Sequence, residues 1–184
     1  MTTTANLAGA THNDGAAPIK VSNAGLVLLQ AYLPLFFERC GLTRDGQFAD
    51  AAANHRAVHL VHLLASGQWA QDEVMLPLAK IMCGISVFTP LMTMDDAPTE
   101  GERDLCDSLL AAVIQYWGKQ HGSSIDGLRG NFLMRDGCLT HQSGSWQLDV
   151  EKRPYDVLLG TFPLSFAVIK FAWMPEPLRV QWRW

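Results

Sequence analysis

Hydrophobic residues recur with a helical period through the first half of the chain. Asn23 is a suitable N-cap for the first helical stretch. Pro34 cannot lie inside an unbroken helix, because it lacks the amide proton and clashes with the preceding turn. The pattern therefore predicts two segments, residues 24–31 and 33–40, with Gly41 as the stop.

Three longer helices are predicted further along the chain. Residues 49–65 are rich in alanine and end before Gly67, and residues 72–83 end before Gly84, with Pro77 as a point of shortening or kinking. Residues 85–98 have no helical period and are expected to form a loop. Thr99 and Glu102 have the spacing of a capping box, which predicts a helix from there to Trp117. A short helical turn is expected over residues 124–130.

The hydrophobic period changes to two after residue 131. Residues 132–140 and 145–152 flank Gln142-Ser143-Gly144, which is typical of a β-hairpin. Residues 154–160 begin with proline and favour a short helical link. Two further strands, residues 166–173 and 178–182, are expected to complete a small antiparallel sheet.

Helices first and strands last are typical of an α+β domain. We therefore predict an N-terminal helical bundle followed by a small C-terminal antiparallel β-sheet. Residues 1–22 are rich in Thr, Ala, Gly and Asn, so we expect a flexible tail there. Residues 23–184 are expected to form a single α+β domain, which suits a chain of 184 residues.

Composition narrows the classes of partner. Hydrophobic residues make up 48% of the chain and charged residues 17%, which suits a globular protein and also a subunit buried among others. The net charge of −4 gives no reason to expect nucleic-acid binding. The apolar runs are shorter than the roughly 18 residues that span a bilayer, so we expect no membrane insertion. The N-terminus does not resemble a signal peptide, which favours the cytoplasm as the place of assembly.

Three histidines are the strongest candidates for chemistry. His55, His59 and His62 share one helical face, and such spacing can bind zinc in a small metal-dependent hydrolase. The His-Glu-x-x-His signature is absent, because Arg56 follows His55. We therefore favour partly buried histidines, bonded to the backbone or to one another, and expect no metal site.

Other reactive side chains give no enzyme signature. Asp95-Asp96 lies in a polar loop, and Asp104 with Asp107 lies near a helix start, where acids favour the helix dipole. The four cysteines form no Cys-x-x-Cys pair, so they are expected to be reduced and packed as small hydrophobes; Cys83 is a nucleophile only if a base lies nearby. We expect no catalytic residue and no cofactor.

Tryptophans concentrate in the last third of the chain. Most are expected in the core, but tryptophan is also enriched at binding hot spots. Near the C-terminus, Trp173, Met174, Trp182 and Trp184 are the candidate interface residues, with plain core packing as the alternative for the first three.

Five blocks in order resemble a known family. They are Asn23–Leu29 with Leu33–Arg39, Asn54–Leu60, Leu78–Gly84, Val113–Trp117 with Ser124–Arg129 and Phe132-Leu133, and Tyr155–Trp182 with its Trp-Met-Pro-x-Pro corner. Together they resemble the conserved C-terminal region of the tape-measure-like proteins of contractile injection systems. The sequence departs from the pattern at Ala172, where the family has a proline before the Trp-Met pair.

The resemblance implies a non-enzymatic structural role. Tape-measure proteins occupy the inner tube during assembly, with the C-terminal end near the baseplate hub, so the implied partners are the hub or spike and the inner-tube proteins. A 22-residue helical tail spans about 33 Å, at about 1.5 Å per residue, which is too short to measure a tube. The chain is therefore expected to be a fragment of a longer ruler, a homologue without a ruler that anchors at the hub, or an assembly initiator. We favour a protein that is anchored near the hub and helps to initiate tube assembly or set tube length.

The assembly state follows from the same resemblance, and two alternative functions stay open beside it. Particles of this kind have three-fold and six-fold axes, so a homotrimer or homohexamer is expected by symmetry matching. The protein is expected first in the cytoplasm and then within the particle. The alternatives are the metal-dependent hydrolase using His55, His59 and His62, and a cytosolic adaptor that loads the tube and then leaves.

Overall fold

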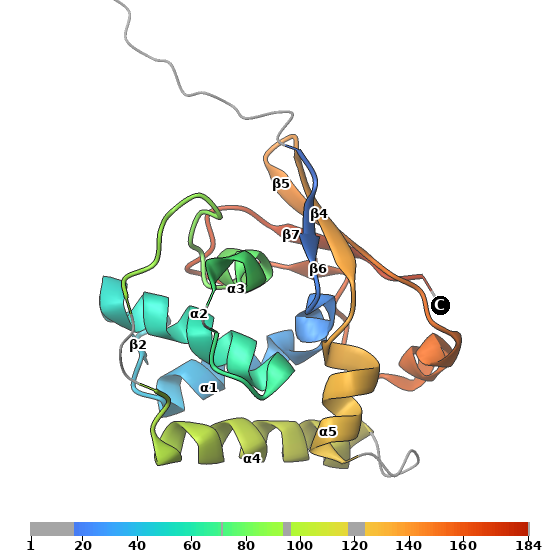
Figure 1. Ribbon diagram of the computed structural model, residues 1–184, viewed down its shortest axis with the longest axis horizontal. Helices are drawn as coiled ribbons and strands as arrows, with labels where there is room; N and C mark the ends of the chain where they lie inside the picture. The colour runs from blue at the N-terminus through green and yellow to red at the C-terminus, as the bar shows by residue number, and fades with distance from the viewer. Residues whose placement is uncertain (1–16, 71, 94–96, 118–123, 184) are drawn as a thin grey trace, which may run out of the picture.

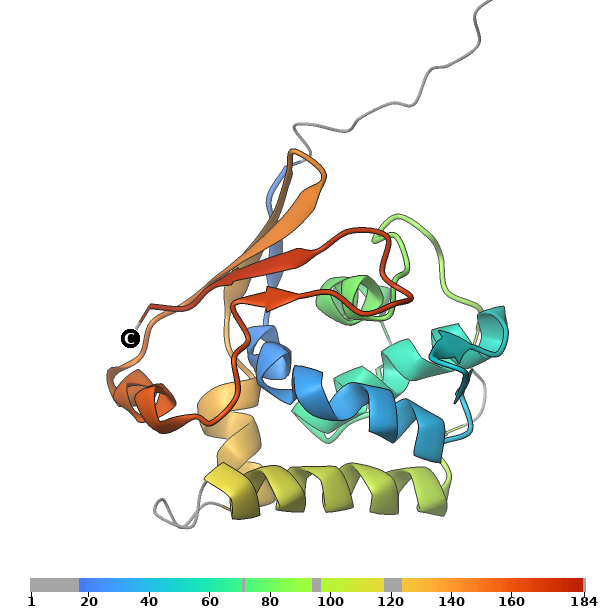
Figure 2. The ribbon, with the colours of Figure 1, turned by 180° about the vertical axis from the view of Figure 1, so that it is seen from behind.

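The fold consists of a five-stranded sheet with helical segments gathered mainly on one side of it (Figures 1 and 2). The computed structural model describes residues 17–70, 72–93, 97–117 and 124–183. The helical segments are η1 Ala24–Tyr32, α1 Leu33–Arg39, α2 Ala51–Ser66, η2 Glu73–Met75, α3 Pro77–Met82, α4 Glu100–Trp117, α5 Ile125–Leu128, η3 Arg129–Leu133 and η4 Pro154–Thr161. The strands are β1 Ile19–Val21, β2 Thr43–Arg44, β3 Gln47–Phe48, β4 Gly137–Gln142, β5 Ser145–Val150, β6 Val168–Ile169 and β7 Leu178–Gln181.

The prediction of an α+β fold is confirmed, but its layout differs in two ways. The first is that a strand, β1, precedes the helices, whereas η4 after the hairpin is the helical link predicted for residues 154–160. The second concerns the sheet. The sheet order is β1-β4-β5-β7-β6, and β5 pairs with β7 in parallel, so the predicted antiparallel sheet is in fact mixed. The reason is the connection after β5: it passes through η4 to the outer edge, where β6 lies, and the chain then returns to place β7 between β5 and β6.

The flexible tail predicted for residues 1–22 extends too far. Ile19–Val21 form β1, which pairs antiparallel with β4, and Val21 is buried. Residues 1–16 lie outside the described residues. The composition of residues 1–22 does not reveal this strand, because β1 pairs with β4, which lies more than a hundred residues away in the sequence.

Prolines divide the helical half where the sequence predicts. Pro34 lies in the first turn of α1, after the 3₁₀ segment η1, and Pro77 begins α3, after η2. Proline suits a first helical turn because the amide groups there need no helical acceptor. The capping box is also present: the Thr99 amide donates to Glu102 Oε2 (2.8 Å), and the Glu102 amide donates to Thr99 Oγ1 (3.2 Å).

The β4–β5 hairpin is confirmed, with Ser143 and Gly144 at its turn at φ values of 49° and 72°. Both values are positive, as a two-residue type I′ turn requires. The first strand begins later than predicted, because Phe132 and Leu133 belong to the π-helical η3. A second short hairpin, β2–β3, turns at Asp45-Gly46, an Asp-Gly signal that the sequence analysis did not use.

The core lies between the sheet and the helices. Alternate residues of the strands face inward and are buried: Leu139, Leu148, Ile169 and Leu178. They pack in one cluster with apolar residues of η1, α2 and α3. Gly25 allows the closest approach within this core, because a Cβ there would lie 1.7 Å from the Phe132 carbonyl oxygen. Two of the blocks that carry the family resemblance therefore touch at a position that only glycine fits.

Candidate interaction surface

The three candidate histidines do not converge on a common point. His55 Nδ1 accepts a hydrogen bond from the Met92 amide (2.8 Å), and the buried His59 ring stacks on Trp69, with 5.1 Å between ring centroids. His62 is buried, and burial lowers the pKa of both His59 and His62. Within the described part of the chain, no group of three His, Cys, Asp or Glu side chains is placed to hold a metal ion.

The cysteines and acidic residues are also dispersed. Cys40, Cys83, Cys106 and Cys138 are all free thiols. Burial raises the pKa of the Cys83 thiol, which disfavours the nucleophilic thiolate. Asp107 lies 3.9 Å from Arg129, and Asp95-Asp96 lies outside the described residues.

The Trp-Met-Pro-x-Pro corner packs against the end of α3. The Trp173 indole donates to the Met82 carbonyl (2.9 Å), and its ring lies against Phe37, Phe48 and Phe171. Gly84, at φ 75°, lies directly beneath it, where a Cβ would be 2.3 Å from the Trp173 carbonyl oxygen. The third and fifth blocks of the resemblance thus form one joint between helix and sheet.

Two other predicted interface residues are buried within the chain. Met174 is 3% exposed and Trp182 is 5% exposed. The Trp182 indole donates to Asp156 Oδ2 (3.0 Å), and the Arg135 guanidinium lies 5.2 Å from the Trp182 ring centroid. Such burial argues against Met174 and Trp182 as interface residues, because neither offers contact area. Trp173 is half-buried, so an interface role for it stays a prediction, and Trp184 lies outside the described residues.

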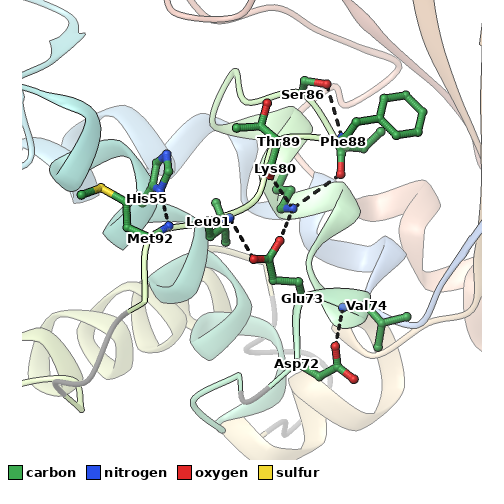
Figure 3. A network of polar contacts seen from close by, with 11 residues as sticks. His55, Asp72, Glu73, Val74, Lys80, Ser86, Phe88, Thr89, Leu91 and Met92 are labelled. Atoms are coloured by element: carbon green, nitrogen blue, oxygen red, sulfur yellow. Dashed lines mark hydrogen bonds and ion pairs between the residues drawn. The ribbon is translucent and has the colours of Figure 1, made fainter.

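A buried lysine organises a different region, the loop predicted after residue 84. Lys80 of α3 is 3% exposed (Figure 3). Its Nζ donates to Glu73 Oε2 (2.5 Å), the Thr89 carbonyl (2.9 Å) and the Val87 carbonyl (3.5 Å). A buried ammonium group needs such partners, because an unpaired charge in the interior is costly. Lys80 therefore holds the loop after α3 against the helix.

The rest of the loop is held at further points. Glu73 Oε1 accepts from the Leu91 amide (2.8 Å), and the next amide, that of Met92, donates to His55. Hydrogen bonds from Lys80 and the Leu91 amide lower the pKa of Glu73 despite the opposing effect of desolvation, so its carboxylate stays charged. Residues 86–92 are thus fixed by groups from α2, η2 and α3 (Figure 3).

Large apolar side chains remain exposed around this fixed loop. Phe88 is 68% exposed, and Figure 3 shows its ring pointing away from the polar network. We define the Phe88 surface as Val74, Met75, Phe88 and Met92, all of which are exposed. Aromatic residues and methionine are enriched at protein interfaces. The loop that carries Phe88 and Met92 is held in place by the hydrogen bonds of Lys80, Glu73 and His55. The sequence signal for it was an unusually apolar loop, residues 85–92, with no charged residue.

A hollow on the surface is lined mainly by apolar and aromatic side chains. It has a volume of about 590 Å³ and lies between η1, α4 and the segment before β6. Its lining residues are Ala31, Tyr32, Ala112, Gln115, Tyr116 and Leu164. They include no carboxylate, histidine, cysteine or lysine that would serve as a general base or metal ligand.

No helix among the described residues is long and apolar enough to cross a membrane.

Comparison with known proteins identifies a family. No curated protein and no solved structure matches the chain. A family model, described as contractile injection system tape measure protein, matches residues 2–182, nearly the whole length. The chain therefore belongs to the contractile injection system tape measure protein family.

Proposed function

We propose that this protein is an assembly component of a contractile injection particle that docks through the Phe88 surface near the baseplate hub and the base of the inner tube. There it helps to initiate tube assembly or to set tube length. Its partners are the hub or spike and inner-tube proteins, and it is present in the cytoplasm before it enters the particle. Family membership supports a structural role related to the tape measure.

The observation that carries the docking proposal is the fixed, apolar loop. An exposed loop loses conformational entropy when it binds, and that loss opposes binding. Residues 86–92 are already held by Lys80, Glu73 and His55, so little of this loss remains. The loop is held rigidly and still exposes Phe88 at 68%. A role in binding explains this combination better than a role in folding alone.

A folded docking module fits better than a ruler for this part of the protein. The described residues form a helix-and-sheet body, and the longest helix among them, α4, spans about 27 Å at about 1.5 Å per residue. Binding at a hub would also favour a homotrimer or homohexamer, since assemblies match the symmetry of their partners.

Particles from cells with and without the gene provide the test, by electron microscopy and mass spectrometry. We expect missing, shortened or aberrant tubes without the gene, and the protein in normal particles with it. Normal particles that lack the protein would contradict the proposal. Aberrant tubes in the deletion strain, with the protein absent from finished wild-type particles, would instead indicate an adaptor that leaves.

A point variant tests the docking site directly. Phe88→Ser should reproduce the deletion phenotype while the purified variant stays folded, because Phe88 contributes little to the core. Tyr116→Ser is the matched control, since Tyr116 is an aromatic residue of similar exposure (65%) on α4. Equal phenotypes for the two variants would contradict docking through the Phe88 surface.

A further inference from the structure

The charged residues next to the Phe88 surface along the chain are acids. Arg56, which follows the Met92 partner His55, is paired with Glu102. Residues 85–93 contain no charged side chain. Asp72, the N-cap of η2, and Glu73 directly precede Val74 and Met75, and both acids are exposed. The nearby cation, Lys80, points inward, with its ammonium group bonded to Glu73 and to two loop carbonyls. Its charge is therefore used inside the molecule and does not reach the surface.

Asp72 supplies the surface charge. Glu73 is already paired with Lys80, and both of its oxygens accept hydrogen bonds. Asp72 Oδ1 accepts from the Val74 amide (3.0 Å), and among the described residues no lysine or arginine forms an ion pair with Asp72. Val74 of the Phe88 surface thus lies beside an exposed carboxylate that forms no ion pair with a described residue.

We infer that the Phe88 surface fits a protein partner with an apolar pocket whose rim carries lysine or arginine. This inference rests on the proposed function, because it describes the partner for the same site. Phe88 supplies the apolar contact, and Asp72 at the border meets the cationic rim. Complementary charges at a rim raise the association rate and weaken as salt screens them.

The Asp72→Asn variant removes the negative charge at this position without removing the N-cap of η2. Asparagine is as good an N-cap as aspartate, so the hydrogen bond to the Val74 amide is retained while the charge is lost. Asp104→Asn is the matched control, because Asp104 is an exposed acid on α4 and its loss changes the net charge by the same amount. Glu73→Gln would not serve, because it would remove the partner of the buried Lys80.

The experiment measures binding of the full chain to purified hub and inner-tube proteins of the same particle, at about 50 mM and about 500 mM salt. We expect Phe88→Ser to abolish binding at both salt concentrations. Asp72→Asn should weaken binding roughly three- to tenfold at low salt and little at high salt, mainly through the association rate. Asp104→Asn should bind like the wild type at both concentrations.

Each other result has a distinct meaning. Binding that needs Phe88 but is equal for the wild type and Asp72→Asn at low salt overturns the cationic rim and leaves the proposed function intact. No binding of the wild type to either protein overturns the proposed function and this inference together. If Phe88→Ser instead changes the mass of the protein alone in analytical ultracentrifugation, the surface joins copies of this chain and the inference is wrong.

Discussion

Asp156 accepts four hydrogen bonds at a site with no exposed surface. Two come from Arg135, one from the Arg153 amide and one from the Trp182 indole, at 2.8 to 3.0 Å. Burial would raise the pKa of Asp156, but these hydrogen bonds, with Arg135 first among them, hold the pKa below its ordinary value. One carboxylate therefore joins the start of η4, the end of η3 and the chain after β7.

Asp156→Asn should destabilise the protein strongly. The variant leaves the Arg135 guanidinium buried without its counter-charge, and removing one partner of a buried pair costs about 3–5 kcal/mol. Glu151→Gln is the control, because the Glu151–Arg153 pair is longer (3.6 Å) and largely exposed, and surface pairs contribute about 0–1 kcal/mol. Urea unfolding of both variants provides the measurement, and equal midpoints would contradict the expected difference.

His59 and His62 should make the protein sensitive to acid. Burial lowers the pKa of both, and for His59 the nearby Arg56 acts in the same direction, partly opposed by Glu73. Below about pH 6.5 the unfolded chain therefore binds protons that the folded chain does not, so stability falls as the pH falls. The slope is at most about 1.4 kcal/mol per pH unit for each histidine.

The measurement is the free energy of unfolding between pH 8 and pH 5 for the wild type and for a His59→Gln, His62→Gln double variant. Values at pH 8 correct for the packing that the substitutions remove. We expect a flatter pH profile for the double variant. Identical profiles would show that these two histidines do not cause the acid sensitivity.

At the level of elements, β1 depends most on distant sequence. Its three residues pair with β4, and Val21 points into the core while Lys20 is exposed. No local signal predicts this strand, just as none predicts that β6 has only two residues or that β7 lies parallel to β5. The hairpin and the proline-bounded helices were predictable, because Ser143-Gly144, Pro34 and Pro77 act through the local backbone.

Val21→Asp should lower stability by about 3 kcal/mol or more, because it places a charge in the core without a partner. Lys20→Gln, one residue away on the solvent side of the same strand, should change it by no more than about 0.5 kcal/mol. Thermal unfolding of both variants distinguishes an integral strand from a loosely attached tail. A tail would leave the Tm of both variants close to that of the wild type.

At the level of the whole molecule, helices and sheet meet at Gly84. The positive φ there and the nearby Trp173 carbonyl leave no room for a side chain. Gly84→Ala should therefore destabilise the fold by about 1–3 kcal/mol, from backbone strain alone. Gly101→Ala in α4 is the control, because nothing lies near its Cβ position and alanine favours helix. An equal Tm for the two variants would contradict a role for Gly84 as the joint.

The candidate site was less predictable than the fold. The sequence predicted an interface at Trp173, Met174 and Trp182 because they are large residues near the C-terminus. It does not reveal that their hydrogen-bond partners are, in the same order, Met82, Phe171 and Asp156. The same limit hid Lys80, whose burial depends on carbonyl groups of a loop with no regular pattern. Long-range partners decide which apolar residues are covered, and a single sequence does not supply them.

The way in which Lys80 and Glu73 hold their loop has an evolutionary consequence. Both recognise main-chain atoms, the carbonyls of Val87 and Thr89 and the amide of Leu91, which every residue type other than proline supplies equally. The outward side chains of the loop therefore take no part in the hydrogen bonds that hold its main chain. Related particles could exchange residues at positions 88 and 92 and acquire new binding preferences without rebuilding the domain, so this loop is a natural target for retargeting by design.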